Sequence, residues 1–405
     1  MEKRFVLAAM LCAAAVLCAC AQSAGSSGAA GESASFAASA GSAAQGGAVS
    51  ASDSGAGGSS APAAAAGINP LTGLPLAEGE SLTARPAAVL VDNVQAALPQ
   101  RGLSGASLLY EAVSEGGITH LLAVYANPAL LPQVGPVCDA RPQHVQLAFP
   151  LDAVLVYRSG TEASDALLEQ CGWQQRTLSG SAEQGALKLD DARSAAAGIA
   201  HSWFTDASLY ASACGTYGID AARTAPAQTA FPFTGTSAPR TLALADGGTV
   251  YVRFSGYTNT TLTYRPALGR YEKAQFGAPQ IDEVTGSVLS FENVFVLFAH
   301  MQNGTDIDYA AGGSGYYFCG GRYEELRWTK DGPAAPLTLT ALSGEPLTVN
   351  PGRSYIALAD EMRRTYFRIQ PLTAAETDAA PADSAADAVS AIPTAGSVSA
   401  ASAAS

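Results

Sequence analysis

The sequence predicts an α+β protein, with an amino-terminal α/β domain built on a mixed sheet and a β-rich, mainly antiparallel carboxy-terminal domain. Two features predict this division. Unbroken apolar runs at 87–91 and 153–157 are typical of strands that are buried on both faces of a sheet. In the second half, short segments alternate between apolar and polar residues and end at Gly, Asn or Pro turns, which favours antiparallel strands. The strands expected there are 249–254, 260–264, 293–298, 315–318, 323–328, 337–342 and 354–358.

In the first half, each further element has a local signal. Residues 106–114 and 118–125 flank a Gly-Gly turn, which predicts a hairpin, although the first arm could equally be a short helix. Asp139 is expected to cap a helix that Pro150 stops, because a side-chain carboxylate accepts hydrogen bonds from the first free N–H groups of a helix. A second helix is expected over 162–170, directly after an apolar strand.

Composition divides the 405 residues into five segments. We expect a lipoprotein signal peptide at 1–19, then a lipid-attachment cysteine with an Ala/Gly/Ser tether at 20–67. The two domains are expected at 68–225 and 230–372, which together are long enough for two cores. The small-residue tail at 373–405 is expected to be disordered, like the tether, because neither buries enough apolar surface to offset the entropy of ordering.

The first twenty residues predict where the protein works. Basic Lys3 and Arg4 precede an apolar stretch from Phe5 to Leu17, and small residues then lead to Cys20. This order is typical of a bacterial lipoprotein signal, and the apolar stretch is shorter than the roughly 20 residues of a spanning helix. We therefore expect a diacylglyceryl group on Cys20 that holds the protein stably at the extracytoplasmic face of the membrane. The alternative is an ordinary or uncleaved signal.

Charge and cysteine spacing exclude several classes of function. A net charge of −13 makes the chain a poor partner for nucleic acid. The four histidines are scattered, and the remaining cysteines show no C-x-x-C spacing, so neither a metal site nor a cofactor is expected. Free thiols and disulfides both remain open for these cysteines, which are Cys138, Cys171, Cys214 and Cys319.

A series of short motifs carries a family resemblance. The folded region opens with the residues Asn69-Pro70-Leu71-Thr72-Gly73-Leu74-Pro75, and Glu115-Gly116-Gly117-Ile118-Thr119, Gly135-Pro136-Val137 and Asn350-Pro351-Gly352 follow in order. In these motifs the chain resembles the YerB-like lipoproteins, a two-domain family whose activity is unassigned. The resemblance implies an extracytoplasmic lipoprotein with an α/β domain followed by a β-rich domain, and it implies no reaction. The chain departs from the family pattern at His120 and Cys138, where arginine is usual.

Polar residues that follow the predicted strands are the candidate binding site. Carboxyl ends of strands meet at one edge of an open α/β sheet, where ligands gather. We expect these side chains to converge there and to bind a polar ligand through carboxylates and guanidiniums. The alternative is a structural ion-pair network that fixes turns. The candidates are Asp92, Asn93, Glu111, Glu115, Arg141 and Arg158.

Three functions are compatible with these features. The leading hypothesis is a membrane-tethered protein without enzymatic activity that binds a cell-wall polymer or an envelope protein. The second is a hydrolase of wall glycan or peptide, in which Glu111 or Glu115 is the acid or base and Arg141 orients the substrate. The third is a solute-binding lipoprotein, although such proteins usually have two similar lobes and the two halves here differ.

Overall fold

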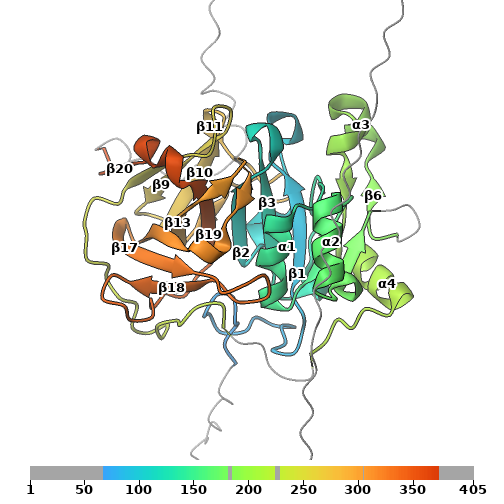
Figure 1. Cartoon of the computed structure of the whole chain (residues 1–405), viewed down its shortest axis with the longest axis horizontal. Helices are drawn as coiled ribbons and strands as arrows, with labels where there is room; N and C mark the ends of the chain where they lie inside the picture. The colour runs from blue at the N-terminus through green and yellow to red at the C-terminus, as the bar shows by residue number, and fades with distance from the viewer. Residues whose placement is uncertain (1–66, 181–184, 224–228, 304, 374–405) are drawn as a thin grey trace, which may run out of the picture. The chain divides into compact units, whose positions relative to one another are not determined.

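A ten-stranded sheet connects the two halves of the chain in the computed structural model, which describes residues 67–180, 185–223, 229–303 and 305–373. Its strand order is β18-β17-β16-β13-β19-β2-β3-β1-β4-β5 (Figure 1). The halves meet where β19 (Ser354–Asp360) pairs in parallel with β2 (Leu108–Val113). The boundary between domains near residues 225–230 stays a prediction, and the large sheet runs across it. The predicted signal peptide, Cys20 and the tether up to residue 66 lie outside the described residues. The tail from residue 374 onward also lies outside them.

The amino-terminal half contributes a mixed set of strands, as predicted. β1 (Ala87–Asp92) pairs in parallel with β4 (Val154–Tyr157), which pairs in parallel with β5 (Thr177–Ser179). β3 (Thr119–Tyr125) is antiparallel to both β1 and β2. Every residue of β1 is buried, in agreement with the unbroken apolar run at 87–91. The β2–β3 hairpin turns through Gly116 and Gly117, whose φ angles of 67° and 78° favour glycine.

Helices α1 (Pro142–Ala148) and α2 (Glu162–Gln170) lie in front of the large sheet in Figure 1. The prediction that Asp139 caps the first helix is wrong. Arg141 occupies the cap position without a side-chain cap, and the proline that follows needs no hydrogen bond at its nitrogen. The expected stop at Pro150 is also displaced, since a 3₁₀ turn at Phe149–Leu151 continues the helix. Two further helices are α3 (Asp191–Ala197) and α4 (Ala207–Tyr217).

The carboxy-terminal half is mainly antiparallel, which confirms the predicted fold class. It completes the large sheet and also forms a smaller sheet of the order β11-β10-β9-β8-β20, with β12 paired to β10. In the large sheet lie β13 (Asn293–Ala299), β16 (Gly313–Cys319), β17 (Arg322–Thr329) and β18 (Thr338–Ala341). The small sheet contains β8 (Thr249–Arg253), β9 (Asn259–Arg265), β10 (Arg270–Gln275), β11 (Ala278–Pro279), β12 (Ser290–Phe291) and β20 (Arg368–Gln370). Two short ribbons pair β6 (Lys188–Leu189) with β7 (Trp203–Phe204) and β14 (Met301–Gln302) with β15 (Asp306–Ile307).

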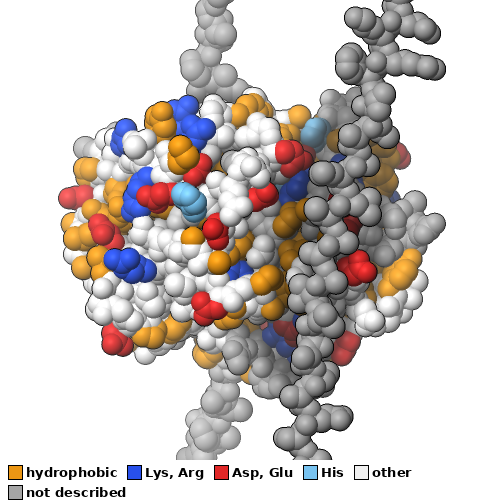
Figure 2. All heavy atoms as spheres, in the orientation of Figure 1, with side chains coloured by type: hydrophobic (Ala, Val, Ile, Leu, Met, Phe, Trp, Pro, Cys, Tyr) orange, Lys and Arg blue, Asp and Glu red, His pale blue; other side chains and the backbone are white. Residues whose placement is uncertain are grey.

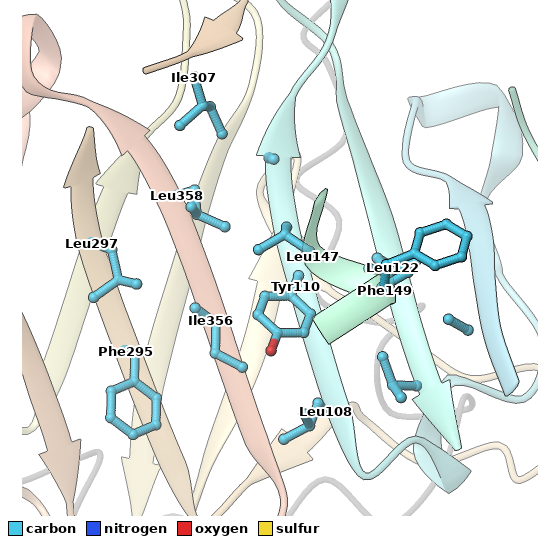
Figure 3. Close-up of a cluster of buried hydrophobic side chains, with 14 of the residues drawn as sticks. Leu108, Tyr110, Leu122, Leu147, Phe149, Phe295, Leu297, Ile307, Ile356 and Leu358 are labelled. Carbon is cyan, nitrogen blue, oxygen red and sulfur yellow. The ribbon is translucent and has the colours of Figure 1, made fainter. Parts of the chain in front are cut away.

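The large sheet has a hydrophobic core on each face. On the helix face, Leu122 packs in one cluster with residues of α1, and Ile356 of the other half belongs to the same cluster (Figure 3). On the opposite face, Val89 and Leu121 belong to a cluster that includes Leu262 of the small sheet. The described chain is therefore layered, with α1 and α2 on one face of the large sheet and with the small sheet and α4 on the other. None of the described helices is long and apolar enough to cross a membrane.

Strand direction defines two edges of the large sheet. β1, β2, β4, β5, β13 and β19 all run the same way, because β3 is antiparallel to both β1 and β2 and the remaining pairs are parallel. We call the edge where these strands end the carboxyl edge, and the edge where they begin the amino edge. In open α/β sheets, ligands bind outside the carboxyl ends of strands. The carboxyl edge is therefore the first place to look for a site.

Candidate functional site

Most of the polar residues predicted from the sequence lie at the carboxyl edge, but the sheet separates them. Asp92 ends β1 on the helix face, and Glu115 and Arg158 follow β2 and β4. Asn93 and Glu111 instead face the small sheet, where both side chains are buried. The structure therefore divides the six candidates into a partly exposed group and a buried group.

The ion pair between Glu115 and Arg141 reaches solvent at this edge. The Nε of Arg141 donates to Glu115 Oε2 at 2.7 Å, and its Nη2 contacts Oε1. The Glu115 side chain is 59% exposed, whereas that of Arg141 is 14% exposed and also donates to the carbonyl oxygen of Ala140. Hydrogen bonding from Arg141 lowers the pKa of Glu115. The guanidinium is thus held from behind, while its carboxylate partner faces solvent.

A second pair joins Asp92 to His201. The His201 Nδ1 lies 2.6 Å from Asp92 Oδ2, and the two side chains are 24% and 10% exposed. No sequence pattern predicts this contact, because the two residues are 109 positions apart and only the folded segment before β7 brings His201 to the edge. An aspartate bound to one ring nitrogen orients the imidazole, which is a common arrangement in binding and catalytic sites.

A third pair explains why Asp139 does not cap a helix. Arg158 donates to both carboxylate oxygens of Asp139 at 3.0 Å, and Ser159 donates to Oδ1 at 2.6 Å. Burial acts against the charged form of Asp139, but hydrogen bonds from Ser159 and Arg158 outweigh it and lower the pKa of the carboxyl group. Asp139 thus fixes the loop after β4 against the segment before α1.

Two buried histidines lie beneath the exposed pairs. The rings of His120 and His144 stack with their centroids 5.6 Å apart. His144 is completely buried, and neither of its ring nitrogens has a hydrogen-bond partner among the described residues; the same holds for Nδ1 of His120. Burial lowers the pKa of both rings, and nearby Arg141 lowers it further. These histidines are 24 residues apart in the sequence and share no recognisable motif, so the sequence does not predict their contact.

Glu111 belongs to a buried polar network between the two sheets. Its carboxylate accepts hydrogen bonds from Asn93 at 3.1 Å, from Thr119 at 2.8 Å and from Tyr355 at 2.7 Å. The Lys273 Nζ lies 3.1 Å from Glu111 Oε2, and both of these side chains are fully buried. Because β2 contributes the carboxylate and β10 the ammonium group, the network links the large sheet to the small one.

A surface groove extends the carboxyl edge into the second half. Its volume is about 460 Å³, and Figure 2 shows that acidic and basic side chains are interspersed over the viewed face and form no patch of a single sign. The strands that end at the groove are β13 and β17, and Glu361 follows β19 beside them. Five strand spacings separate β13 from β4 in the sheet, so the edge from this groove to Arg158 spans about 24 Å.

The described residues contain no group of three or more side chains suited to hold a metal ion. Cys138, Cys171, Cys214 and Cys319 are free thiols in the structure. Burial raises the pKa of the Cys138 thiol well above its usual range, so this cysteine beside the candidate site is a poor nucleophile.

Two family models match this two-part arrangement. Residues 71–218 match the "Protein of unknown function (DUF3048) N-terminal domain", and residues 250–356 match the corresponding C-terminal domain. The chain therefore belongs to the DUF3048 family. Over 313 residues it is 27% identical to "Putative lipoprotein YerB" of Bacillus subtilis (strain 168), which covers 72% of this chain and 86% of that protein. This match, together with the two family models, confirms the resemblance to YerB-like lipoproteins.

The crystal structure of the YerB protein from Bacillus subtilis has the same fold. It superposes with a TM-score of 0.64 at 24% sequence identity, covering 75% of this chain and 99% of that chain. This match supports the mixed sheet of the amino-terminal half and the antiparallel strands of the carboxy-terminal half. The match shows a shared fold, and it indicates neither a reaction nor a ligand.

Proposed function

We propose that this protein is attached through a diacylglyceryl group on Cys20 to the extracytoplasmic face of the membrane and binds a cell-wall polymer or an envelope protein along its carboxyl edge. The observation that carries the proposal is the length of this edge. A groove lies at one end and the Arg158–Asp139 pair lies about 24 Å away at the other, with the Glu115–Arg141 pair between them. This length suits an extended glycan or peptide better than a single small solute. The membrane anchor supplies the location in which such polymers occur.

The Glu115–Arg141 pair provides a chemical basis for recognition. Arg141 is held by the carbonyl oxygen of Ala140, so its guanidinium keeps its position when its other partner changes. Glu115 is largely exposed and an exposed ion pair contributes little stability, so an incoming carboxylate can replace it at small cost. A guanidinium binds carboxylates through two parallel hydrogen bonds, which makes this exchange specific.

The geometry does not favour the hydrolase alternative based on Glu111 and Glu115. Glu111 is fully buried between the two sheets, where a polymer cannot reach it without opening the core. The pKa of Glu115 is lowered by Arg141, whereas a general acid needs a raised pKa. Binding through Arg141 is therefore the stronger proposal.

The test compares binding of the mature chain, starting at residue 20, with that of two variants. Arg141→Gln removes the proposed recognition group, and Arg270→Gln is the matched control, because Arg270 also pairs with a glutamate but lies at the amino edge. Proteins are crosslinked in membranes and recovered together with wall fragments or envelope proteins. We expect Arg141→Gln to reduce recovery of the partner about tenfold, as is typical for the loss of one charge-assisted contact. Equal recovery for both variants, or no recovery above a tether-only control, would contradict the proposal.

A further inference from the structure

Three arginines gather around one aspartate at the amino edge, on the opposite side of the large sheet from the candidate binding edge. Arg85 precedes β1, Asp152 precedes β4 and Arg176 precedes β5. Because these three strands are adjacent and parallel, their amino ends lie side by side. Arg223, from the end of the first half, joins them. We call these four residues the amino-edge cluster.

All three guanidiniums contact the carboxylate of Asp152. Arg176 Nη1 lies 2.6 Å from Oδ1 and Arg223 Nε lies 3.1 Å from Oδ2, while Arg85 Nη1 also contacts Oδ1. Arg223 is further fixed by a hydrogen bond of 2.8 Å to the carbonyl oxygen of Leu151. The cluster therefore carries two more positive charges than negative ones, in a chain whose net charge is −13.

This excess of charge is more than a structural pair requires. One guanidinium is enough to neutralise a carboxylate and to bind both of its oxygens. Burial lowers the pKa of Arg223; Asp152 acts in the opposite direction, and repulsion from Arg85 and Arg176 lowers the pKa further. The cluster thus holds like charges together at an energetic cost, and an added anion would relieve that repulsion.

The site is also accessible. The side chain of Arg176 is 40% exposed and that of Asp152 is 32% exposed, whereas Arg223 is only 8% exposed and forms the base of the cluster. A ligand can therefore approach from solvent and meet preorganised guanidiniums, two of which are largely desolvated. Such groups bind anions more strongly than freely hydrated side chains do, since less hydration is lost and less ordering is needed.

We propose that the amino-edge cluster binds a phosphate oxyanion, either as free phosphate or as the phosphate of a lipid headgroup. Guanidinium groups match the geometry of phosphate oxygens, and arginine is the preferred residue for this contact. Phosphate offers more oxygens than a carboxylate and up to two negative charges, so it matches both the number of guanidiniums and the excess charge. The cluster lies at the edge opposite to the proposed recognition edge, so both sites can be occupied together and each can be tested alone.

The first experiment titrates the mature chain, without its lipid, with inorganic phosphate at constant ionic strength and follows binding by calorimetry. Arg176→Gln removes the most exposed guanidinium and is expected to weaken binding about tenfold. Asp152→Asn removes the competing negative charge and is expected to tighten binding several-fold. Asparagine also tolerates the φ angle of 55° at this position, so the backbone should be retained. Arg363→Gln, at the carboxyl edge after β19, is the charge-matched control and should bind like the wild type.

The opposite effects of these two variants separate a binding site from a purely structural cluster. If the cluster only stabilises the fold, both substitutions lower the melting temperature and neither changes phosphate affinity in the expected direction. The absence of phosphate binding by the wild type, or an equal loss in Arg176→Gln and Arg363→Gln, would overturn the proposal even if the first substitution also affected stability.

A second experiment identifies the source of the phosphate. The same proteins are sedimented with phosphatidylglycerol vesicles. Binding to the vesicles that Arg176→Gln weakens and Arg363→Gln does not supports a lipid headgroup. Binding of inorganic phosphate without binding of vesicles supports a soluble phosphate compound. Failure of both experiments overturns the site, and it leaves the test of Arg141 at the carboxyl edge unaffected.

Discussion

Replacing Lys273 by methionine tests whether the buried ion pair with Glu111 holds the two sheets together. Methionine has a similar length and is apolar, so the substitution removes the charge and the hydrogen bonds while largely preserving packing. Both partners are fully buried, with Nζ and Oε2 3.1 Å apart. The variant would therefore leave a carboxylate without its counter-ion in the core.

The magnitude follows from this burial. Removing one partner of a buried ion pair destabilises a protein by about 3–5 kcal/mol, because the other charge stays desolvated. Glu111 retains hydrogen bonds from Asn93, Thr119 and Tyr355, so we expect a loss near the lower end, about 3 kcal/mol. Substituting Glu111→Gln in addition removes the uncompensated charge and should restore part of this loss.

Urea unfolding, followed by circular dichroism, measures this difference. The control is Lys188→Met, which removes an exposed lysine and should change the free energy of unfolding by less than about 0.5 kcal/mol. If Lys273→Met were no less stable than the control, the inference that a charged pair joins the two sheets would be refuted.

Three further predictions use the same unfolding assay. Burial places the pKa of His144 in the folded chain well below 6.5, so below pH 6.5 the unfolded chain takes up a proton that the folded chain does not. The contribution of His144 to stability is therefore full above pH 6.5 and falls by up to about 1.4 kcal/mol per pH unit below it. His144→Phe should flatten this pH dependence between pH 7 and 5, and an unchanged slope would contradict the prediction. Glu115→Gln should cost less than about 1 kcal/mol because its pair with Arg141 is exposed on one side, and a larger loss would indicate a structural role. Leu358→Ala, in the buried strand beside β2, should cost about 2–5 kcal/mol, whereas a loss as small as that of a surface substitution would argue against a continuous core across the two halves.

The strands that could be predicted from the sequence are those whose apolar composition indicates that they are buried. β1 and β4 are apolar on both faces because both faces are covered, so the pattern and the outcome have the same cause. β10 was missed because its sequence, Arg270–Gln275, is largely polar, although Lys273 and Gln275 are buried. No local pattern distinguishes a buried polar strand from a loop when its partners lie in another sheet.

The sequence also could not predict which distant strands pair with each other. The run at 354–358 was correctly expected to be a strand, but its apolar residues would suit any neighbour, and only the assembled sheet shows that it pairs with β2. The cap predicted at Asp139 failed for a related reason. The local signal is genuine, but Arg158, nineteen residues away, supplies a better partner in the folded chain than the N–H groups of a helix do.

Contacts between distant segments also decide which polar residues are available for function. Glu111 and Glu115 lie in the same hairpin. Glu111 is enclosed by partners from β3, β10 and β19, whereas Glu115 reaches solvent beside Arg141. A ligand can exchange with the second carboxylate and not with the first, because only the second can be displaced without exposing the core. Recognition by this protein should therefore depend on residues at the edges of the large sheet. Substitutions in its buried polar network should change stability first and binding only as a consequence.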